Sequence, residues 1–456
     1  MTSISSFWTL DRIAAALEEC STVPPPRGAT EIHGIATDTR SIEPGYLFVA
    51  LKGERFDGHD FLETAAVAGA GGLVVADPPA LGAFQIPVFQ VKDTLIALGA
   101  LARYWRRAWN NTVVAVAGSN GKTTTKDLIR AALCEEMRVH ATAGNLNNRV
   151  GVPLTLFDLP SHAECAVVEL GSNIPGEVAI LRDIAEPQIA VVTSVAEEHL
   201  EGFGDLAGVL REETSVYDGV SVGVAPSAQP DIVNAARRLA KRVVTAGLDS
   251  GDVRPKSWKI EPDGRGTLEL DGVVVSPPLR GMHNLENTML AVAIARECGV
   301  SDASIANGIA RMAVPKMRSA WETIGRATVI NDAYNSNPGS ARAAIALLEG
   351  IGSGRQRVVV LGTMRELGAS ADKLHDEISR LALDSGADVI AGIGDFETSL
   401  GRVADGDKRV VTAGSPEEMW PLLEPRLAPD AVILLKASRG VQLERLVPHL
   451  TTWAKQ

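Results

Sequence analysis

The chain has 456 residues, of which 45% are hydrophobic and 22% charged, so it can bury several cores; at about 150 residues per domain it predicts three domains. Its net charge of −12 argues against general binding to nucleic acid or to anionic membranes. The four cysteines are scattered, and we find no signal-like N-terminus and no apolar run of about 18 residues. These features predict a cytoplasmic protein with no membrane span.

The first predicted domain spans residues 1–110 and has a small α/β pattern. Short apolar runs predict strands at 48–51 and 72–76, and a helix is expected between them at 61–70. An amphipathic helix over 95–109 leads into the second domain.

The second predicted domain spans residues 111–313. Its apolar runs predict strands at the positions 113–117, 165–170 and 189–194. Helical segments fall between these strands, and this alternation is typical of a parallel sheet. The segment 254–278, rich in Gly, Asp and β-formers, predicts a small antiparallel excursion, and a helix is expected over 284–297.

The third predicted domain spans residues 314–456 and alternates in the same way. Strands are expected at 328–331, 357–361, 388–391, 409–412 and 431–435, and helices at 339–349, 370–385 and 416–424. This layout is Rossmann-like. Because it lacks a G-x-G-x-x-G sequence, we do not interpret it as a dinucleotide site.

A glycine loop between the strand 113–117 and the following helix is the clearest functional signal. It reads Gly118-Ser119-Asn120-Gly121-Lys122-Thr123-Thr124. Loop N–H groups and the positive end of a helix form a cradle for phosphate. Lys122 is placed to reach the β- and γ-phosphates, and the Thr123 hydroxyl to hold Mg²⁺. The general P-loop has a further Gly five places before Gly121, where this chain has Val116, so the loop is of a shorter type.

Two further residues follow predicted strands. Glu169 ends a buried strand, where a carboxylate in P-loop proteins faces the metal, although an ordinary strand-end acid would have the same place. His199 lies just after a strand, at the edge where ligands bind in α/β folds, although a lone His is more often structural. Asn335 and Ser336, before the helix at 339–349, would either cap that helix or contact a ligand.

Motifs along nearly the whole chain resemble those of the Mur ligases. They are Asp38 to Ser41, Phe48 to Phe61, the glycine loop, Asn145 to Asn148, Glu169 to Gly171, His199 to Phe203, His283 to Asn287, Asn331 to Pro338, Val360 to Gly368 and Lys436 to Arg439. The resemblance implies a three-domain α/β architecture: a small UDP-binding N-terminal domain, a central parallel-sheet P-loop domain and a C-terminal Rossmann-like domain. The strings Asn-Leu-Asn-Asn and Asp-Ala-Tyr-Asn-Ser-Asn-Pro resemble the branch that adds D-alanyl-D-alanine to UDP-MurNAc-tripeptide.

The resemblance also implies the chemistry. ATP would phosphorylate the peptide carboxylate, and the amine of the dipeptide would then displace phosphate from the acyl phosphate. By family analogy Thr123 and Glu169 hold Mg²⁺, and His199 ligates a second Mg²⁺. The glycine loop would bind ATP together with Asn284, Arg318 and Asp332. No nucleic acid is expected as a partner, and we expect a monomer.

Substrate contacts are implied by position in the family motifs. For the UDP portion they are Ser41, Lys52 and His59; for the UDP-sugar peptide, Asn147 and Asn148; for the dipeptide, Asn335, Ser336, Ser438 and Arg439.

Among the positions that depart from the resemblance, one concerns the metal site. The family usually has a lysine fourteen residues after its histidine, and CO₂ carbamylates that lysine so that it helps to hold the second Mg²⁺. This chain has Glu213 there, and no lysine occurs between Lys126 and Lys241. We expect Glu213 to supply the carboxylate directly; the alternative is a decayed site.

Three other functions remain open at this point. The first is a sibling Mur-type amide ligase with another amino-acid substrate. The second is a P-loop NTPase that works as a switch or motor, which would not need the UDP-site motifs or a third domain. The third is a non-catalytic nucleotide-binding protein, which only the change at Glu213 favours.

Overall fold

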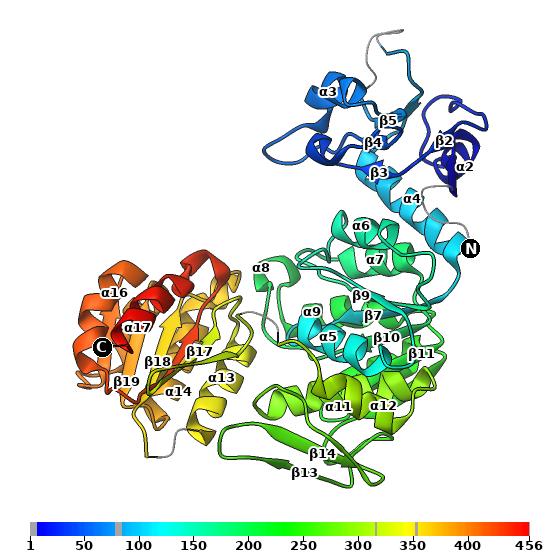
Figure 1. The fold of residues 1–456 in the computed structure, drawn as a ribbon. Coiled ribbons are helices and arrows are strands. Elements are labelled where there is room, and N and C mark those ends of the chain that lie inside the picture. The colour runs from blue at the N-terminus through cyan, green and yellow to red at the C-terminus, as the bar shows by residue number, and fades with distance from the viewer. Residues whose placement is uncertain (1–6, 78–83, 315–316, 352–353, 456) are drawn as a thin grey trace. The chain divides into compact units, whose positions relative to one another are not determined.

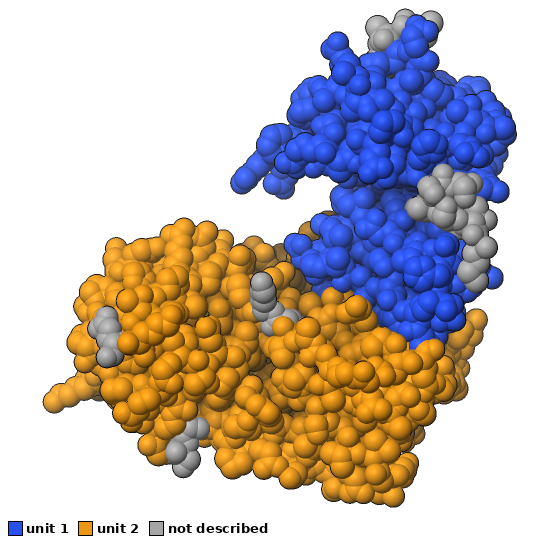
Figure 2. All heavy atoms as spheres, viewed as in Figure 1, with its two compact units in different colours: residues 1–115, 137–172, 176–189 blue, residues 116–136, 173–175, 190–456 orange. Residues whose placement is uncertain are grey.

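The structure is a computed structural model that describes residues 7–77, 84–314, 317–351 and 354–455. Its contacts divide the chain into two compact units (Figure 2). Unit 1 comprises residues 1–115, 137–172 and 176–189, and unit 2 comprises 116–136, 173–175 and 190–456. Within the described ranges no helix has the length and apolar character needed to cross a membrane.

The N-terminal segment is α/β, as predicted (Figure 1). Its elements are β1 (Trp8–Thr9), α2 (Leu10–Ala16), β2 (Glu31–Ile32), β3 (Ile35–Ala36), β4 (Leu47–Val49), α3 (Leu62–Val67), β5 (Gly72–Val75), β6 (Val88–Gln90) and α4 (Thr94–Trp109), with 3₁₀ turns at Thr39–Ser41 and Gly58–Phe61. Strands β3 to β6 form a parallel sheet in that order. The predicted helix over 61–70 is shorter than expected, because the chain turns at Gly69, whose φ is +91°.

The middle segment carries a six-stranded sheet in the order β12-β11-β10-β7-β9-β8, in which β11–β12 and β8–β9 pair in parallel. Its strands and helices are β7 (Thr112–Ala117), α5 (Lys122–Leu133), β8 (Val139–Ala141), α6 (Gly151–Phe157), β9 (Cys165–Glu169), α7 (Glu177–Ala185), β10 (Ile189–Val192), α8 (Leu200–Phe203), α9 (Leu206–Thr214), β11 (Val222–Pro226), α10 (Pro230–Leu239), β12 (Arg242–Ala246), α11 (Met282–Glu297) and α12 (Asp302–Ala310), with a 3₁₀ turn at Ser215–Tyr217. The predicted antiparallel excursion is confirmed as β13 (Ser257–Ile260), β14 (Gly266–Leu270) and β15 (Val273–Val275).

Tyr217 ties two strands of unit 2 together from a fully buried position. Its hydroxyl donates to the Val224 carbonyl (2.6 Å) and accepts from the Val192 N–H (3.0 Å). We expect Tyr217→Phe to lower the free energy of unfolding by about 1–3 kcal/mol, because it leaves buried polar groups without this partner. Urea unfolding measures the change, with the partly exposed Tyr104→Phe as the control. Equal unfolding curves for Tyr217→Phe and wild type would contradict this role of the hydroxyl.

The C-terminal segment has a six-stranded sheet in the order β16-β17-β21-β18-β19-β20. Its elements are β16 (Ala320–Ile324), β17 (Ala327–Asp332), α13 (Pro338–Gly350), β18 (Arg357–Gly362), α14 (Ala371–Asp384), β19 (Val389–Ile393), α15 (Asp395–Val403), β20 (Val410–Ala413), α16 (Pro416–Leu423), β21 (Val432–Lys436) and α17 (Leu446–Trp453), with 3₁₀ turns at Gly368–Ser370, Glu424–Arg426, Arg439–Val441 and Leu443–Arg445. The predicted strands are confirmed. The antiparallel strand β16 and the helices α15 and α17 were not predicted.

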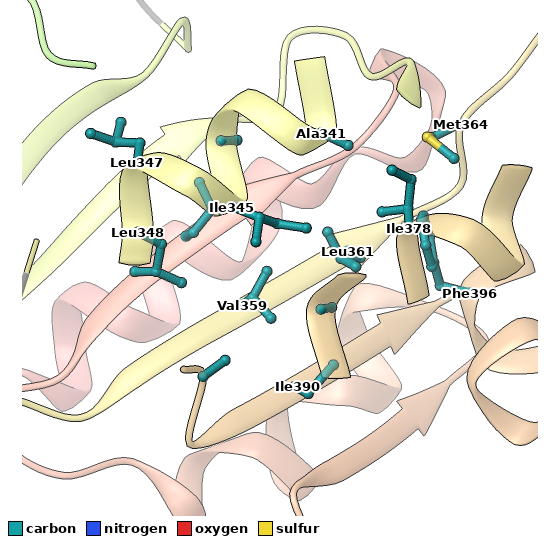
Figure 3. Close-up of a cluster of buried hydrophobic side chains, with 14 of the residues drawn as sticks. Ala341, Ile345, Leu347, Leu348, Val359, Leu361, Met364, Ile378, Ile390 and Phe396 are labelled. Carbon is teal, nitrogen blue, oxygen red and sulfur yellow. The ribbon is translucent and has the colours of Figure 1, made fainter. Parts of the chain in front are cut away.

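This sheet is buried on both faces, which explains its continuous apolar strands. Along β18, Val359 and Leu361 pack with α13 and α14, whereas Val358 and Val360 pack with α16 and α17. Figure 1 shows these two helix pairs, and Figure 3 shows the first of the two cores. The alternation follows from the two-residue period of a strand.

Candidate active site

The loop between β7 and α5 leads directly into the N-terminus of a helix. Helix α5 begins at Lys122 after Gly121, whose φ of +84° is left-handed, and no side chain caps the helix. The first N–H groups of a helix have no partner within the helix, so they suit an anion. Thr123 and Thr124 lie in this first turn and are almost fully buried.

The loop is fixed by the segment that follows β10. Gly118 has a φ of +121°, and a Cβ there would lie 2.4 Å from Thr193 Oγ1, so only glycine fits. The Ser119 N–H donates to the Ser194 carbonyl (2.8 Å), and Thr193 Oγ1 donates to the Asn120 carbonyl (2.6 Å). The polar groups of Ser119 and Asn120 therefore hold the loop in shape.

Lys122 lies between this loop and two buried acids. Its Nζ donates to the Gly118 carbonyl and is 4.0 Å from Glu198 Oε1. Glu198 is 5% exposed and Glu213 only 1%. Glu213 Oε2 accepts the Gly118 N–H at 2.5 Å. Glu213, which stands where the family usually has a lysine, therefore contacts Gly118, the first residue of the glycine loop.

The buried carboxyl groups of Glu198 and Glu213 are both influenced by the same positive charge, that of Lys122. The pKa of Glu198 is raised to about 8, chiefly by burial and also by the nearby Glu213, while Lys122 opposes the rise. Burial also raises the pKa of Glu213, against the effects of Lys122 and of the Gly118 N–H. One lysine therefore faces two buried carboxyl groups, and a further cation would favour their ionised forms.

The donor set fits Mg²⁺. Among the residues that the structure describes, Glu198 Oε1 and Glu213 Oε1 are buried without a hydrogen-bond partner. Such oxygens are rare in native proteins and normally mark an ion, a water or a functional role. Mg²⁺ prefers carboxylate and other oxygen ligands.

His199 directly precedes the short helix α8 and has a left-handed φ of +47°. Its Nδ1 contacts Oε2 of Glu366, and its side chain is 17% exposed. Within unit 2, Lys122 therefore lies beside Glu198, Glu213 contacts the glycine loop, and His199 directly follows Glu198 along the chain.

Glu169 belongs to unit 1, at the end of β9, and is 2% exposed. Its N–H donates to Thr142 Oγ1 (2.9 Å), and its Oε1 accepts from Asn147 Nδ2 (2.9 Å). Its Oε2 is buried without a hydrogen-bond partner within the described ranges, which also suits a metal ligand. Asn148 has a different place: its Oδ1 accepts the Gly151 N–H (2.8 Å) at the start of α6.

Two of the three candidates for UDP contacts lie around Asp57. Lys52 Nζ is 3.5 Å from the Asp57 carboxylate, and His59 Nδ1 is 2.6 Å from it. His59 Nε2 accepts the Ala76 N–H (3.0 Å), so both ring nitrogens make contacts within this segment. Ser41 lies in the 3₁₀ turn Thr39–Ser41, where its hydroxyl donates to the Asp38 carbonyl (2.9 Å).

The nucleotide candidates outside the loop are positioned by unit 2. Asn284, in the first turn of α11, is buried. The Arg318 guanidinium lies 4.1 Å from the ring centroid of Tyr334. Asp332, at the end of β17, accepts the Ser319 N–H (2.7 Å) and pairs with the buried Lys436 (2.7 Å).

Three of the dipeptide candidates lie close to one another or to Lys436 through two backbone carbonyls. Lys436 Nζ donates to the Asn335 carbonyl (2.8 Å), and Ser438 Oγ donates to the Ser336 carbonyl (3.3 Å). Arg439 does not join this group, because its guanidinium pairs with Glu444 (2.9 Å).

Sequence reasoning missed three residues of this region: Glu198, Glu366 and Lys436. The Glu197–Glu198 doublet directly before His199 was a signal for the first, and the motif Lys436 to Arg439 contained the third. Glu366 lies in the motif Val360 to Gly368, but its contact with His199 could not be predicted, because the two residues are distant along the chain.

Comparison with known proteins decides the family. The family description "Mur ligase middle domain" matches residues 116–295, "Mur ligase, glutamate ligase domain" matches 317–439, and "Mur ligase family, catalytic domain" matches 31–120. The chain belongs to the Mur ligase family. This Mur ligase is therefore an ATP-dependent ligase with the three-domain α/β fold that its sequence predicts.

Relatives of this Mur ligase cover almost its whole length. UDP-N-acetylmuramoyl-tripeptide–D-alanyl-D-alanine ligase of Bacillus subtilis (strain 168) is 34% identical, over 92% of this chain and 93% of the relative. The ligase of the same name from Escherichia coli (strain K12) is also 34% identical, over 92% and 94%. Among solved structures, MurF from Acinetobacter baumannii has a TM-score of 0.88 at 30% identity, covering 98% of this chain and 99% of that one. MurF from Thermotoga maritima, in complex with ADP, has a TM-score of 0.83 at 26% identity, covering 92% and 98%.

Proposed function

We propose that this Mur ligase joins D-alanyl-D-alanine to the peptide carboxylate of UDP-MurNAc-tripeptide, as a step of peptidoglycan precursor synthesis. The observation that carries the proposal is the 34% identity to two ligases of that name over 92% of the chain. ATP and Mg²⁺ are the cofactors.

The residues of the glycine loop support the first chemical step. ATP transfers its γ-phosphoryl group to the substrate carboxylate, which gives ADP and an acyl phosphate. The Lys122 ammonium and the N–H groups at the start of α5 neutralise the negative charge that the phosphates bring. The amine of D-alanyl-D-alanine then attacks the acyl carbon, and the tetrahedral intermediate releases phosphate as the amide forms.

Thr123, Glu169 and His199 would hold Mg²⁺, and Glu213 would add a carboxylate oxygen. When bound, Mg²⁺ withdraws charge from the phosphoryl oxygens and so makes the phosphorus more electrophilic. The buried oxygens of Glu169 and Glu213 that lack a hydrogen-bond partner support the roles of these two residues.

The remaining contacts follow the family motifs. The domains that carry them would be residues 1–110 for UDP, 111–313 for ATP and 314–456 for the dipeptide. Asn284, Arg318 and Asp332 would bind the nucleotide beside the loop residues Gly118 to Thr124. The proposed substrate residues are Ser41, Lys52, His59, Asn147, Asn148, Asn335, Ser336, Ser438 and Arg439.

We further propose that the protein is cytoplasmic and monomeric. Light scattering on the purified protein tests the oligomeric state.

An ADP-release assay tests the function. The protein receives ATP, Mg²⁺ and UDP-MurNAc-tripeptide, with and without D-alanyl-D-alanine. We expect sustained ADP release only when both substrates are present, together with an amide product of matching mass. Sustained turnover with a single amino acid in place of the dipeptide would instead identify a sibling ligase. Sustained ADP release from ATP without either other substrate would identify a simple NTPase.

The metal ligands give a separate prediction. We expect His199→Ala and Glu169→Ala each to raise the Mg²⁺ concentration needed for half-maximal activity, by about tenfold or more, because each removes a ligand. A Mg²⁺ titration of initial rates at saturating ATP measures the shift, and the exposed Glu349→Gln in α13 is the control. A titration curve equal to that of wild type would remove the residue concerned from the ligand set.

A further inference from the structure

The first observation concerns the ring of His199. Its Nδ1 contacts the Glu366 carboxylate, which comes from the loop after β18. A neutral imidazole carries its proton on one nitrogen and a lone pair on the other. Because an ionised carboxylate only accepts hydrogen bonds, this contact puts the proton of neutral His199 on Nδ1 and its lone pair on Nε2.

The second observation is that the backbone of the two residues directly before Glu366 is anchored. The Met364 N–H donates to His375 Nε2 (3.0 Å), and the Arg365 N–H donates to Ser438 Oγ (3.0 Å). Glu366 itself has a left-handed φ of +65°. Such a conformation is costly for a residue other than glycine and persists where its surroundings hold it. The backbone that carries the Glu366 side chain is therefore held in place, although the side chain itself is 55% exposed.

The third observation is that the two segments share one core within unit 2. Leu200 and Phe203 of α8 belong to the same buried cluster as Met364 and Leu367. Gly368, which follows Leu367, has a φ of +56°. A Cβ at this position would come within 3.3 Å of Glu201 Cγ. Apolar packing and a close backbone approach thus hold α8 and the loop together, with His199 and Glu366 at their contact.

We propose that Glu366 is a positioning residue: it fixes the tautomer and the orientation of His199 so that Nε2 is presented to Mg²⁺. The proposal rests on the proposed function, in which His199 ligates the metal. Carboxylates that accept from the second nitrogen of a ligating histidine orient the ring and raise its basicity. The C-terminal domain then contributes to the metal site through a residue that touches neither metal nor substrate.

The first test reads the tautomer without metal. Protein labelled with ¹⁵N-histidine is studied by NMR at pH 8, and His199→Ala identifies the His199 signals. We expect the Nδ1–H tautomer in the wild type and in Glu349→Gln. In Glu366→Ala we expect a mixture with the Nε2–H tautomer. A wild-type ring in the Nε2–H form, or an unchanged tautomer in Glu366→Ala, would overturn the proposal.

The second test reads metal affinity. Mn²⁺ binding in the presence of ADP is measured by electron paramagnetic resonance, and melting curves establish that each variant is folded. We expect the Mn²⁺ dissociation constant to rise about tenfold or more in Glu366→Ala, in the range for an outer partner of a metal ligand, and less in Glu366→Gln, which keeps an acceptor oxygen. Adding Glu366→Ala to His199→Ala should weaken binding no further.

The outcomes separate the two proposals. If His199→Ala weakens Mn²⁺ binding but neither Glu366 variant does, the positioning role is wrong and the ligand assignment stands. If His199→Ala leaves Mn²⁺ binding unchanged, the ligand assignment fails and the positioning role fails with it. Additive losses in the double variant would mean that Glu366 acts independently of His199, and would also overturn the inference.

Discussion

Lys122→Ala is expected to lower turnover severely while leaving the fold intact. The Lys122 side chain is 15% exposed, donates to the Gly118 carbonyl and lies 4.0 Å from Glu198. The side chain therefore contributes a positive charge at the N-terminus of α5 rather than apolar packing. Losing one preorganised charge at a transition state costs about a hundredfold to a thousandfold in kcat. ADP release under saturating substrates measures the loss.

The control for this prediction is Lys241→Ala, which removes an exposed lysine outside the glycine loop. Lys122→Arg adds a second comparison, because it keeps the positive charge but changes its shape. Circular dichroism melting curves establish that each variant is folded. A folded Lys122→Ala enzyme that keeps more than about a tenth of the wild-type kcat, far above the loss expected for such a charge, would contradict the phosphate-loop assignment.

Glu213→Gln is the variant with the second large expected effect. Gln keeps an oxygen that accepts the Gly118 N–H, so the loop contact at 2.5 Å survives while the negative charge is lost. If the carboxylate helps to hold Mg²⁺ near the acyl phosphate, kcat should fall by about a hundredfold or more. KM for D-alanyl-D-alanine should change much less, because no contact to the dipeptide is removed.

Two further measurements separate the roles open to Glu213. A Glu213→Gln enzyme with normal kcat would mean that the residue only anchors the loop, and Glu213→Ala, which removes the acceptor as well, would then show the anchoring effect. The wild-type enzyme should be insensitive to bicarbonate and to removal of CO₂, because it carries no lysine at this position. Bicarbonate-stimulated activity would instead mean that a lysine from elsewhere in the chain reaches the site.

Glu213→Lys extends the comparison. It restores the residue that the family usually carries, at a position only 1% exposed. Burial lowers the pKa of a lysine, and the neutral amine is the form that reacts with CO₂. We expect the activity of this variant to rise with bicarbonate, whereas Glu349→Gln and the wild type should show no such rise.

Local sequence was sufficient for most of the fold. Runs such as Arg357–Gly362 predicted a strand because a sheet covered by helices on both faces needs apolar residues at every position. The edge strand Ala320–Ile324 escaped prediction, since most of its side chains are half-buried or exposed and it pairs antiparallel with its single neighbour. Its partners, not its composition, make it a strand.

For the active site, the sequence by itself determined the glycine loop, Lys122 and the family, because phosphate binding needs consecutive residues at fixed spacing between a strand and a helix. Only the tertiary structure decided that Glu213 meets Gly118 and that Glu198 shares Lys122 with it. It alone also paired His199 with Glu366. Each of these contacts joins residues far apart in the chain, and the packing of helices and loops at the sheet edge, not any local pattern, brings them within reach of one another.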